Sequence, residues 1–192
     1  MLRKAFLVIF ALCLAACQQS PQNVISPIDS DLTGFEALKS GGKSPSSEYA
    51  YIGHGNSPFI SIVDAQNFVE VARVLVPENN APNVAISKDG KFAYATHNNA
   101  PGLSKIDLKT KSVIGTIALQ PGAFDVAVTP NGKKLFVTQF NSHSVAAIDA
   151  GSLTLLADIP LTDDTDYPNG IAVSPGGHQI YIANQGSGRV HV

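Results

Sequence analysis

Four polar side chains recur at one position of this sequence and have the residue types best suited to chemistry. They are 43, 42 and 45 residues apart, and each follows a short apolar segment: His54, His97, Gln139 and Asn184. A neutral imidazole can bind a metal ion or act as a general base near neutral pH. A catalytic metal site normally has three protein ligands, and only two of these four residues are histidines. The pattern therefore favours a polar column over a metal ion or a catalytic base.

A second candidate is a loop with three carboxylates, Asp163, Asp164 and Asp166. Calcium prefers such oxygen ligands, but their spacing differs from that of the Asp-x-Asp-x-Asp-Gly calcium loop. We expect a solvated acidic loop, with calcium binding as the alternative. The sequence also contains no Gly-x-Ser-x-Gly, P-loop or His-Glu-x-x-His motif. We therefore expect no cofactor, leave a metal ion as the alternative, and favour a binding protein over an enzyme.

A sequence repeat must position these residues. Similar segments begin at residues 44, 87, 129 and 174, and each combines a tight turn with a β-type strand. A period of roughly forty residues with several short strands is typical of β-propeller blades. The turns at Asp89-Gly90, Asn131-Gly132 and Gly176-Gly177 supply the positive φ angles that tight hairpins need. We predict an all-β propeller of four-stranded antiparallel blades, in which the polar column lies at one mouth of the central channel.

The unit at residues 82–128 shows the repeat most clearly. Its pattern predicts strands at residues 84–86, 91–96, 103–106 and 112–119. The first strand of each unit has a central alanine between two branched residues, which we expect to pack tightly near the axis. The acids that end the third strands are expected to bond backbone amides of the next turn: Asp64, Asp107 and Asp149.

The end of the second strand carries a family resemblance. Its four versions are variants of Tyr-Val-Thr-Asn: Tyr51-Ile52-Gly53-His54, Tyr94-Ala95-Thr96-His97, Phe136-Val137-Thr138-Gln139 and Tyr181-Ile182-Ala183-Asn184. Residues 44–192 resemble the YVTN family of β-propeller repeats, which is related to lactonase-like and haem d1-like propellers. The resemblance implies the propeller fold. Its function is open, because similar repeats occur in surface-layer proteins, nucleic-acid-binding periplasmic proteins and enzymes.

The first 47 residues have the composition of a targeting signal followed by a flexible tether. Arg3 and Lys4 precede a short apolar run and the segment Leu14-Ala15-Ala16-Cys17, which resembles the bacterial lipobox. We predict a lipoprotein signal peptide at residues 1–16, lipidation of Cys17, a flexible tether at residues 17–47 and propeller repeats at residues 48–192. An ordinary signal peptide followed by a chance cysteine is the alternative. The absence of aspartate after Cys17 favours the outer membrane, facing the periplasm or the exterior.

Cysteine use and charge narrow the function classes. Cys13 lies in the signal peptide, so lipidation of Cys17 leaves no thiol for a disulfide, a metal site or covalent haem. Loss of Arg3 and Lys4 from 13 basic residues leaves 11 against 15 acidic residues, a net charge of −4 with neutral histidines. This charge argues against nucleic acid as a partner.

The repeats amount to about three and a half blades, whereas propellers have roughly four to eight. We expect either a fragment of a larger, roughly seven-bladed ring, or, if the chain is complete, two copies that close one ring. The sequence predicts a lipid-anchored envelope module that binds a protein, peptide or glycan through one face. A lactonase-like or metal-dependent hydrolase and a haem d1-type redox domain are the alternatives.

Overall fold

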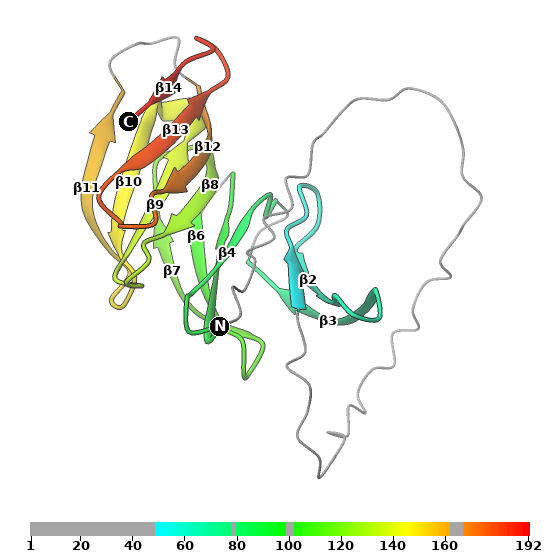
Figure 1. The fold of residues 1–192 in the computed structure, drawn as a ribbon. Coiled ribbons are helices and arrows are strands. Elements are labelled where there is room, and N and C mark those ends of the chain that lie inside the picture. Colours follow the sequence, from blue (N-terminus) through cyan, green and yellow to red (C-terminus); the bar gives the residue numbers. More distant parts are fainter. Residues whose placement is uncertain (1–48, 78–79, 99–101, 162–166) are drawn as a thin grey trace, which may run out of the picture. The chain divides into compact units, whose positions relative to one another are not determined.

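The computed structural model describes residues 49–77, 80–98, 102–161 and 167–192, which form four antiparallel sheets (Figure 1). The predicted signal peptide, Cys17, the tether and the acidic loop with Asp163, Asp164 and Asp166 lie outside the described residues. No helix in the described part of the chain is long and apolar enough to cross a membrane. The four sheets confirm the prediction of an all-β fold built from propeller blades.

Each sheet is a meander in which consecutive strands pair. We number the sheets as blades in chain order. Blade 1 contains β1 (Tyr49–Ile52), β2 (Phe59–Asp64) and β3 (Val69–Leu75); blade 2 contains β4 (Val84–Ile86), β5 (Phe92–Thr96), β6 (Gly102–Asp107) and β7 (Ser112–Ala118). Blade 3 contains β8 (Ala123–Val128), β9 (Lys134–Gln139), β10 (Ser144–Asp149) and β11 (Thr154–Pro160); blade 4 contains β12 (Pro168–Val173), β13 (Ile180–Asn184) and β14 (Val190–His191). In blades 2 and 3 the four strands have the same order, which we call first to fourth. By their positions in the repeat, β1, β2 and β3 are the second to fourth strands of blade 1, and β12, β13 and β14 are the first to third strands of blade 4.

One turn is repeated after the third strand of three blades. The carboxylate of Asp107 accepts the backbone N–H groups of Lys109 and Thr110 at 2.8 and 2.9 Å. These hydrogen bonds stabilise the ionised form and lower the pKa of Asp107, that of Thr110 most strongly. The residue four positions after the aspartate has a positive φ of 54–57° in each turn: Phe68, Lys111 and Leu153. The predicted structural role of Asp64, Asp107 and Asp149 is confirmed, because all three accept two such amides.

The cores lie between neighbouring blades. Buried residues of blades 1 and 2 form one cluster, and those of blades 2 and 3, which include Leu103, Leu135 and Ile148, form another. Five of the described alanines are fully buried: Ala93 and Ala95 in a second strand, Ala146 in a third strand, Ala123 at the start of first strand β8, and Ala81 shortly before β4. The expectation of crowding at the central alanine of each first strand is wrong for the described structure, since Ala127 is only half-buried and Ala172 is exposed. Sheets packed face to face bury the middle strands most, because these strands have neighbours on both sides.

The third residue of the first three tetrapeptides lies at a joint between blades: Gly53, Thr96 and Thr138. The Thr96 hydroxyl donates to the Phe124 carbonyl at 2.7 Å, and the Thr138 hydroxyl reaches the Asn169 carbonyl at 3.4 Å. Both carbonyls are at the first strand of the next blade. At the same repeat position in blade 1, a Cβ on Gly53 would lie 2.8 Å from the Pro82 carbonyl oxygen. This position therefore connects each of these blades to the first strand of the following blade.

Candidate functional site

Loops between strands, together with the first two residues of β8 and of β12, share one edge of the sheets, which we call the loop face. It comprises residues 53–58, 76–77, 80–83, 97–98, 119–124, 140–143, 161, 167–169 and 185–188. Two backbone hydrogen bonds link these loops across blades: Ala81 N–H to the His54 carbonyl at 2.9 Å, and Gly122 N–H to the Asn98 carbonyl at 3.1 Å. Within blade 4, the Gln185 N–H donates to the Tyr167 carbonyl at 2.9 Å. The four candidate polar residues lie next to this face, at the ends of second strands.

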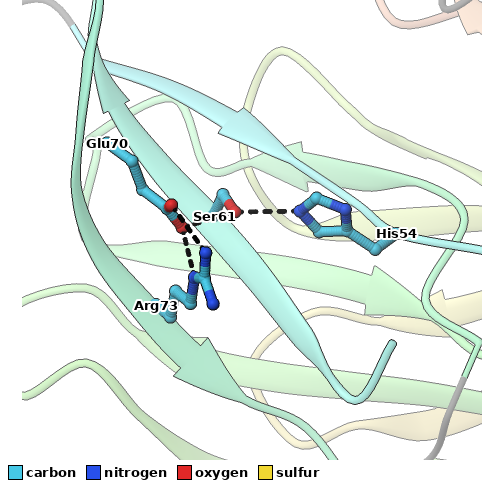
Figure 2. Close-up of polar contacts among 4 residues, drawn as sticks. All are labelled: His54, Ser61, Glu70 and Arg73. Carbon is cyan, nitrogen blue, oxygen red and sulfur yellow. Dashed lines mark hydrogen bonds and ion pairs between the residues drawn. The ribbon is translucent and has the colours of Figure 1, made fainter. Parts of the chain in front are cut away.

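His54 begins a chain of hydrogen bonds within blade 1 (Figure 2). Its Nε2 lies 2.8 Å from the Ser61 hydroxyl, which donates to Glu70 Oε1 at 2.8 Å. Arg73 donates to the two Glu70 oxygens at 2.6 and 2.9 Å, and these bonds are the main cause of the lowered pKa of Glu70. Ser61 has one hydroxyl proton, and that proton is directed at Glu70. His54 Nε2 is then the donor to Ser61, so this geometry does not activate the serine as a nucleophile.

The same pairing with a serine recurs in the next two blades. His97 Nε2 lies 2.8 Å from the Ser104 hydroxyl, and Gln139 Nε2 donates to Ser144 at 2.8 Å and to Asp158 at 2.7 Å. These serines belong to third strands and Asp158 to a fourth strand, so the polar side chains are directed toward the outer strands. Asn184 is buried, and neither polar atom of its side chain has a hydrogen-bond partner in the described structure.

The sequence predicted a polar column at the channel mouth but not these third-strand serines, which offer each side chain a hydrogen-bond partner within its own blade. The structure gives each of His54, His97 and Gln139 its own serine and does not bring the three to a common ligand. Among the described residues, no three His, Cys, Asp or Glu side chains are grouped closely enough to hold a metal ion.

His97 is fully buried, and burial lowers its pKa to about 4 from an ordinary value of 6.5. The folded protein therefore binds fewer protons than the unfolded chain between these two values. The free energy of unfolding should be unaffected by this group above pH 6.5 and should fall as the pH drops from 6.5 to 4.

His97→Gln should weaken this acid sensitivity. Glutamine already occupies the equivalent position in blade 3, where Gln139 bonds the third-strand serine at 2.8 Å. We expect a melting temperature near that of the wild type at neutral pH and a smaller decrease on acidification. Circular dichroism melts across this pH range measure both quantities. An unchanged pH dependence in the variant would contradict the assignment of the titration to His97.

The sequence reasoning missed two polar residues at first strands, Asp125 within β8 and Asn83 just before β4. Asp125 accepts its neighbour Val126 N–H at 2.8 Å and the Ile171 N–H of blade 4 at 3.0 Å, while burial raises its pKa. At the same repeat position in blade 2, Asn83 donates to the Phe124 carbonyl at 2.8 Å. Asn83 and Asp125 occupy equivalent positions in the repeat, each directly before a Val-Ala pair, and this equivalence could have identified them from the sequence. Both residues join first strands of adjacent blades.

A cluster of stacked rings, which we call the aromatic platform, lies on the loop face. Phe124 and Phe140 have centroids 6.1 Å apart, Phe140 and Tyr167 are 5.1 Å apart, and His143 and Tyr167 are 4.7 Å apart. All four rings are partly accessible, and Tyr167 is the most exposed at 38%. Amide side chains lie nearby, since Asn169 donates to Gln185 at 3.0 Å. The sequence pattern did not predict this platform, because its members come from three separate segments: the start of β8, residues 140–143, and Tyr167 before β12.

The platform can bind a ligand by stacking. Partly exposed aromatic rings offer a large apolar area with little conformational entropy to lose, and neighbouring amides can orient a polar ligand. Proteins that recognise peptides or sugars commonly combine these two features. The four antiparallel sheets define the chain as a β-propeller protein.

Solved structures agree with this class of protein. Hydrazine synthase from Kuenenia stuttgartiensis is 23% identical, with a TM-score of 0.64 over 74% of this chain and 47% of that chain. A dihydro-heme d1 dehydrogenase, NirN, in complex with DHE is 20% identical, with a TM-score of 0.58 over 71% of this chain and 30% of that chain. The chain thus spans less than half the length of either protein. No protein-family model and no curated protein matches the sequence. At these identities the likeness shows the β-propeller fold alone.

Proposed function

We propose that this protein is a lipid-anchored β-propeller of the bacterial envelope, of the YVTN-repeat type, that binds a protein, peptide or glycan through its loop face. The aromatic platform is the observation that carries the binding role. Its four rings are partly accessible, whereas the polar groups suited to catalysis are engaged within the blades. Anchoring rests on the lipobox-like segment before Cys17.

The described residues favour neither alternative. A hydrolase would use a base near an accessible nucleophile, and Ser61 instead donates its proton to Glu70. A haem d1-type domain would use accessible axial ligands, and His97 is fully buried against Ser104. Both histidines therefore fit a structural role, while the aromatic platform faces outward.

Tyr167→Ser should weaken binding to envelope material. The test measures how much of the full chain sediments with peptidoglycan or with outer-membrane proteins, presented separately. We expect about a tenfold loss of affinity, as for an aromatic residue at the centre of an interface. Tyr181→Ser is the matched control, because Tyr181 has nearly the same exposure, 40% against 38%, but lies in β13 away from the aromatic platform. Equal binding by all three proteins would overturn the proposed face.

A second experiment, in cells that express the full chain, tests the lipid anchor. Cys17→Ser should release the protein from the membrane fraction or leave its signal peptide uncleaved, because acyl chains need the thiol. Mass spectrometry of the mature wild type should find a lipidated N-terminal cysteine. An unmodified Cys17 in mature protein would refute the anchor and leave the binding role to be decided by the Tyr167 variant.

A further inference from the structure

Lys105 places a positive charge between blades 2 and 3. Its side chain extends from β6, and the residue is only 9% exposed. The ammonium donates to the carbonyl oxygens of Ala150 and Gly151 at 2.8 and 3.1 Å and lies 4.6 Å from the centre of the Phe92 ring. No carboxylate in the described structure lies within ion-pair distance of the ammonium, although Asp149 interacts with its charge electrostatically. A buried charge without a directly bonded ionic partner is costly, so its presence calls for an explanation.

The repeat shows that this lysine is not needed to join two blades. The equivalent residue is Ile62 in blade 1 and Ala147 in blade 3, as counted back from the aspartates that end their strands. Ile62 is 4% exposed and packs in the apolar cluster between blades 1 and 2. An aliphatic side chain is therefore sufficient at this position of the fold. Among these three equivalent positions, only the one between blades 2 and 3 carries a charged side chain.

A pocket of about 360 Å³ opens at this joint. Lys105, Phe92 and Tyr94 line it beside the turns of the two blades, with Ala150 and Gly151 on one side. A pocket of about 370 Å³ lies at the joint between blades 1 and 2, where the residues equivalent to Ala150 and Gly151 are Leu108 and Lys109. The two pockets have similar size, but only the first contains a buried ammonium. The repeat thus supplies an internal control for its chemistry.

We propose that the pocket at Lys105 binds a small organic monocarboxylate with an apolar body. Two N–H groups of the ammonium are directed at backbone carbonyls, so one N–H remains for a ligand oxygen. The rings of Phe92 and Tyr94 supply apolar surface for the rest of the ligand. Asp89 also lines the pocket, engaged by Ser87 at 2.6 Å and by Lys91 at 3.5 Å. Lys88 also lines the pocket, so Asp89 and Lys88 contribute opposite charges, and the single buried ammonium matches a monoanion better than a phosphate dianion.

Benzoate is a suitable probe, with benzyl alcohol as its uncharged counterpart and inorganic phosphate as the alternative anion. The full chain in detergent is titrated with each while NMR follows the Ala150 and Gly151 amides and the lysine side-chain signals. We expect benzoate to shift these amides and the Lys105 signal, with a Kd of about 1 mM. Benzyl alcohol and phosphate should bind at least tenfold more weakly.

Lys105→Met should weaken benzoate binding at least tenfold, whereas Lys109→Met, in the pocket between blades 1 and 2, should leave it unchanged. The side-chain signal of Lys105 in the wild type keeps the test decisive if the methionine variant does not fold. No shift of that signal at roughly 10 mM benzoate would overturn the proposal. Equal shifts with phosphate or with benzyl alcohol would overturn the assignment to carboxylates.

Discussion

Ile148→Ala should lower the free energy of unfolding by about 2–5 kcal/mol, the usual cost of removing a fully buried aliphatic side chain. Ile148 lies in β10 with 0% exposure and belongs to the cluster between blades 2 and 3. Blades hold their positions by mutual packing, so a cavity there removes contacts from two sheets at once. Urea unfolding followed by circular dichroism measures the loss.

Ile114→Ala is the matched control. Ile114 has the same side chain on β7 but is 52% exposed, so we expect a loss of less than about 1 kcal/mol. Similar losses in the two variants would show that the cluster between blades 2 and 3 is not packed as described.

Gly53→Ala should also destabilise the protein, by roughly 1–3 kcal/mol or more. The added Cβ would collide with the backbone carbonyl of Ala81 and would lie 2.8 Å from that of Pro82. These are backbone atoms, and the Ala81 N–H is itself bonded to the His54 carbonyl at 2.9 Å, so they cannot move without loosening the joint between blades 1 and 2. Thermal and urea unfolding should both show the effect.

Gly55→Ala tests whether the loss comes from collision. Gly55 lies two residues away, and its nearest neighbour, the Asn80 side-chain oxygen, is 4.0 Å from the position of an added Cβ. We expect this variant to unfold like the wild type. If Gly53→Ala is as stable as Gly55→Ala, the close approach of the two blades at Gly53 is wrong.

The sequence alone determined the strands and turns. Strands expected at 84–86 and 112–119 are found as β4 (Val84–Ile86) and β7 (Ser112–Ala118). Asp107 and its counterparts were predicted to hold the turns that follow them, and they do. These features depend on neighbours within a few residues, through turn chemistry and the alternation of side chains. A period of roughly forty residues then predicts blades, because each sheet needs another to cover its apolar faces.

The tertiary structure decided where the functional side chains point. His54 and His97 were placed correctly at strand ends, but their direction depends on a serine seven residues later, brought opposite by strand pairing. The aromatic platform joins Phe124 to Tyr167 through segments of different blades, and the Lys105 pocket needs the turn at Ala150 from the next blade. Such contacts form only when separate blades pack together. The sequence repeat shows which residues are equivalent between blades. The residues that meet at each joint belong to two different blades, and only the packing of these blades brings them into contact.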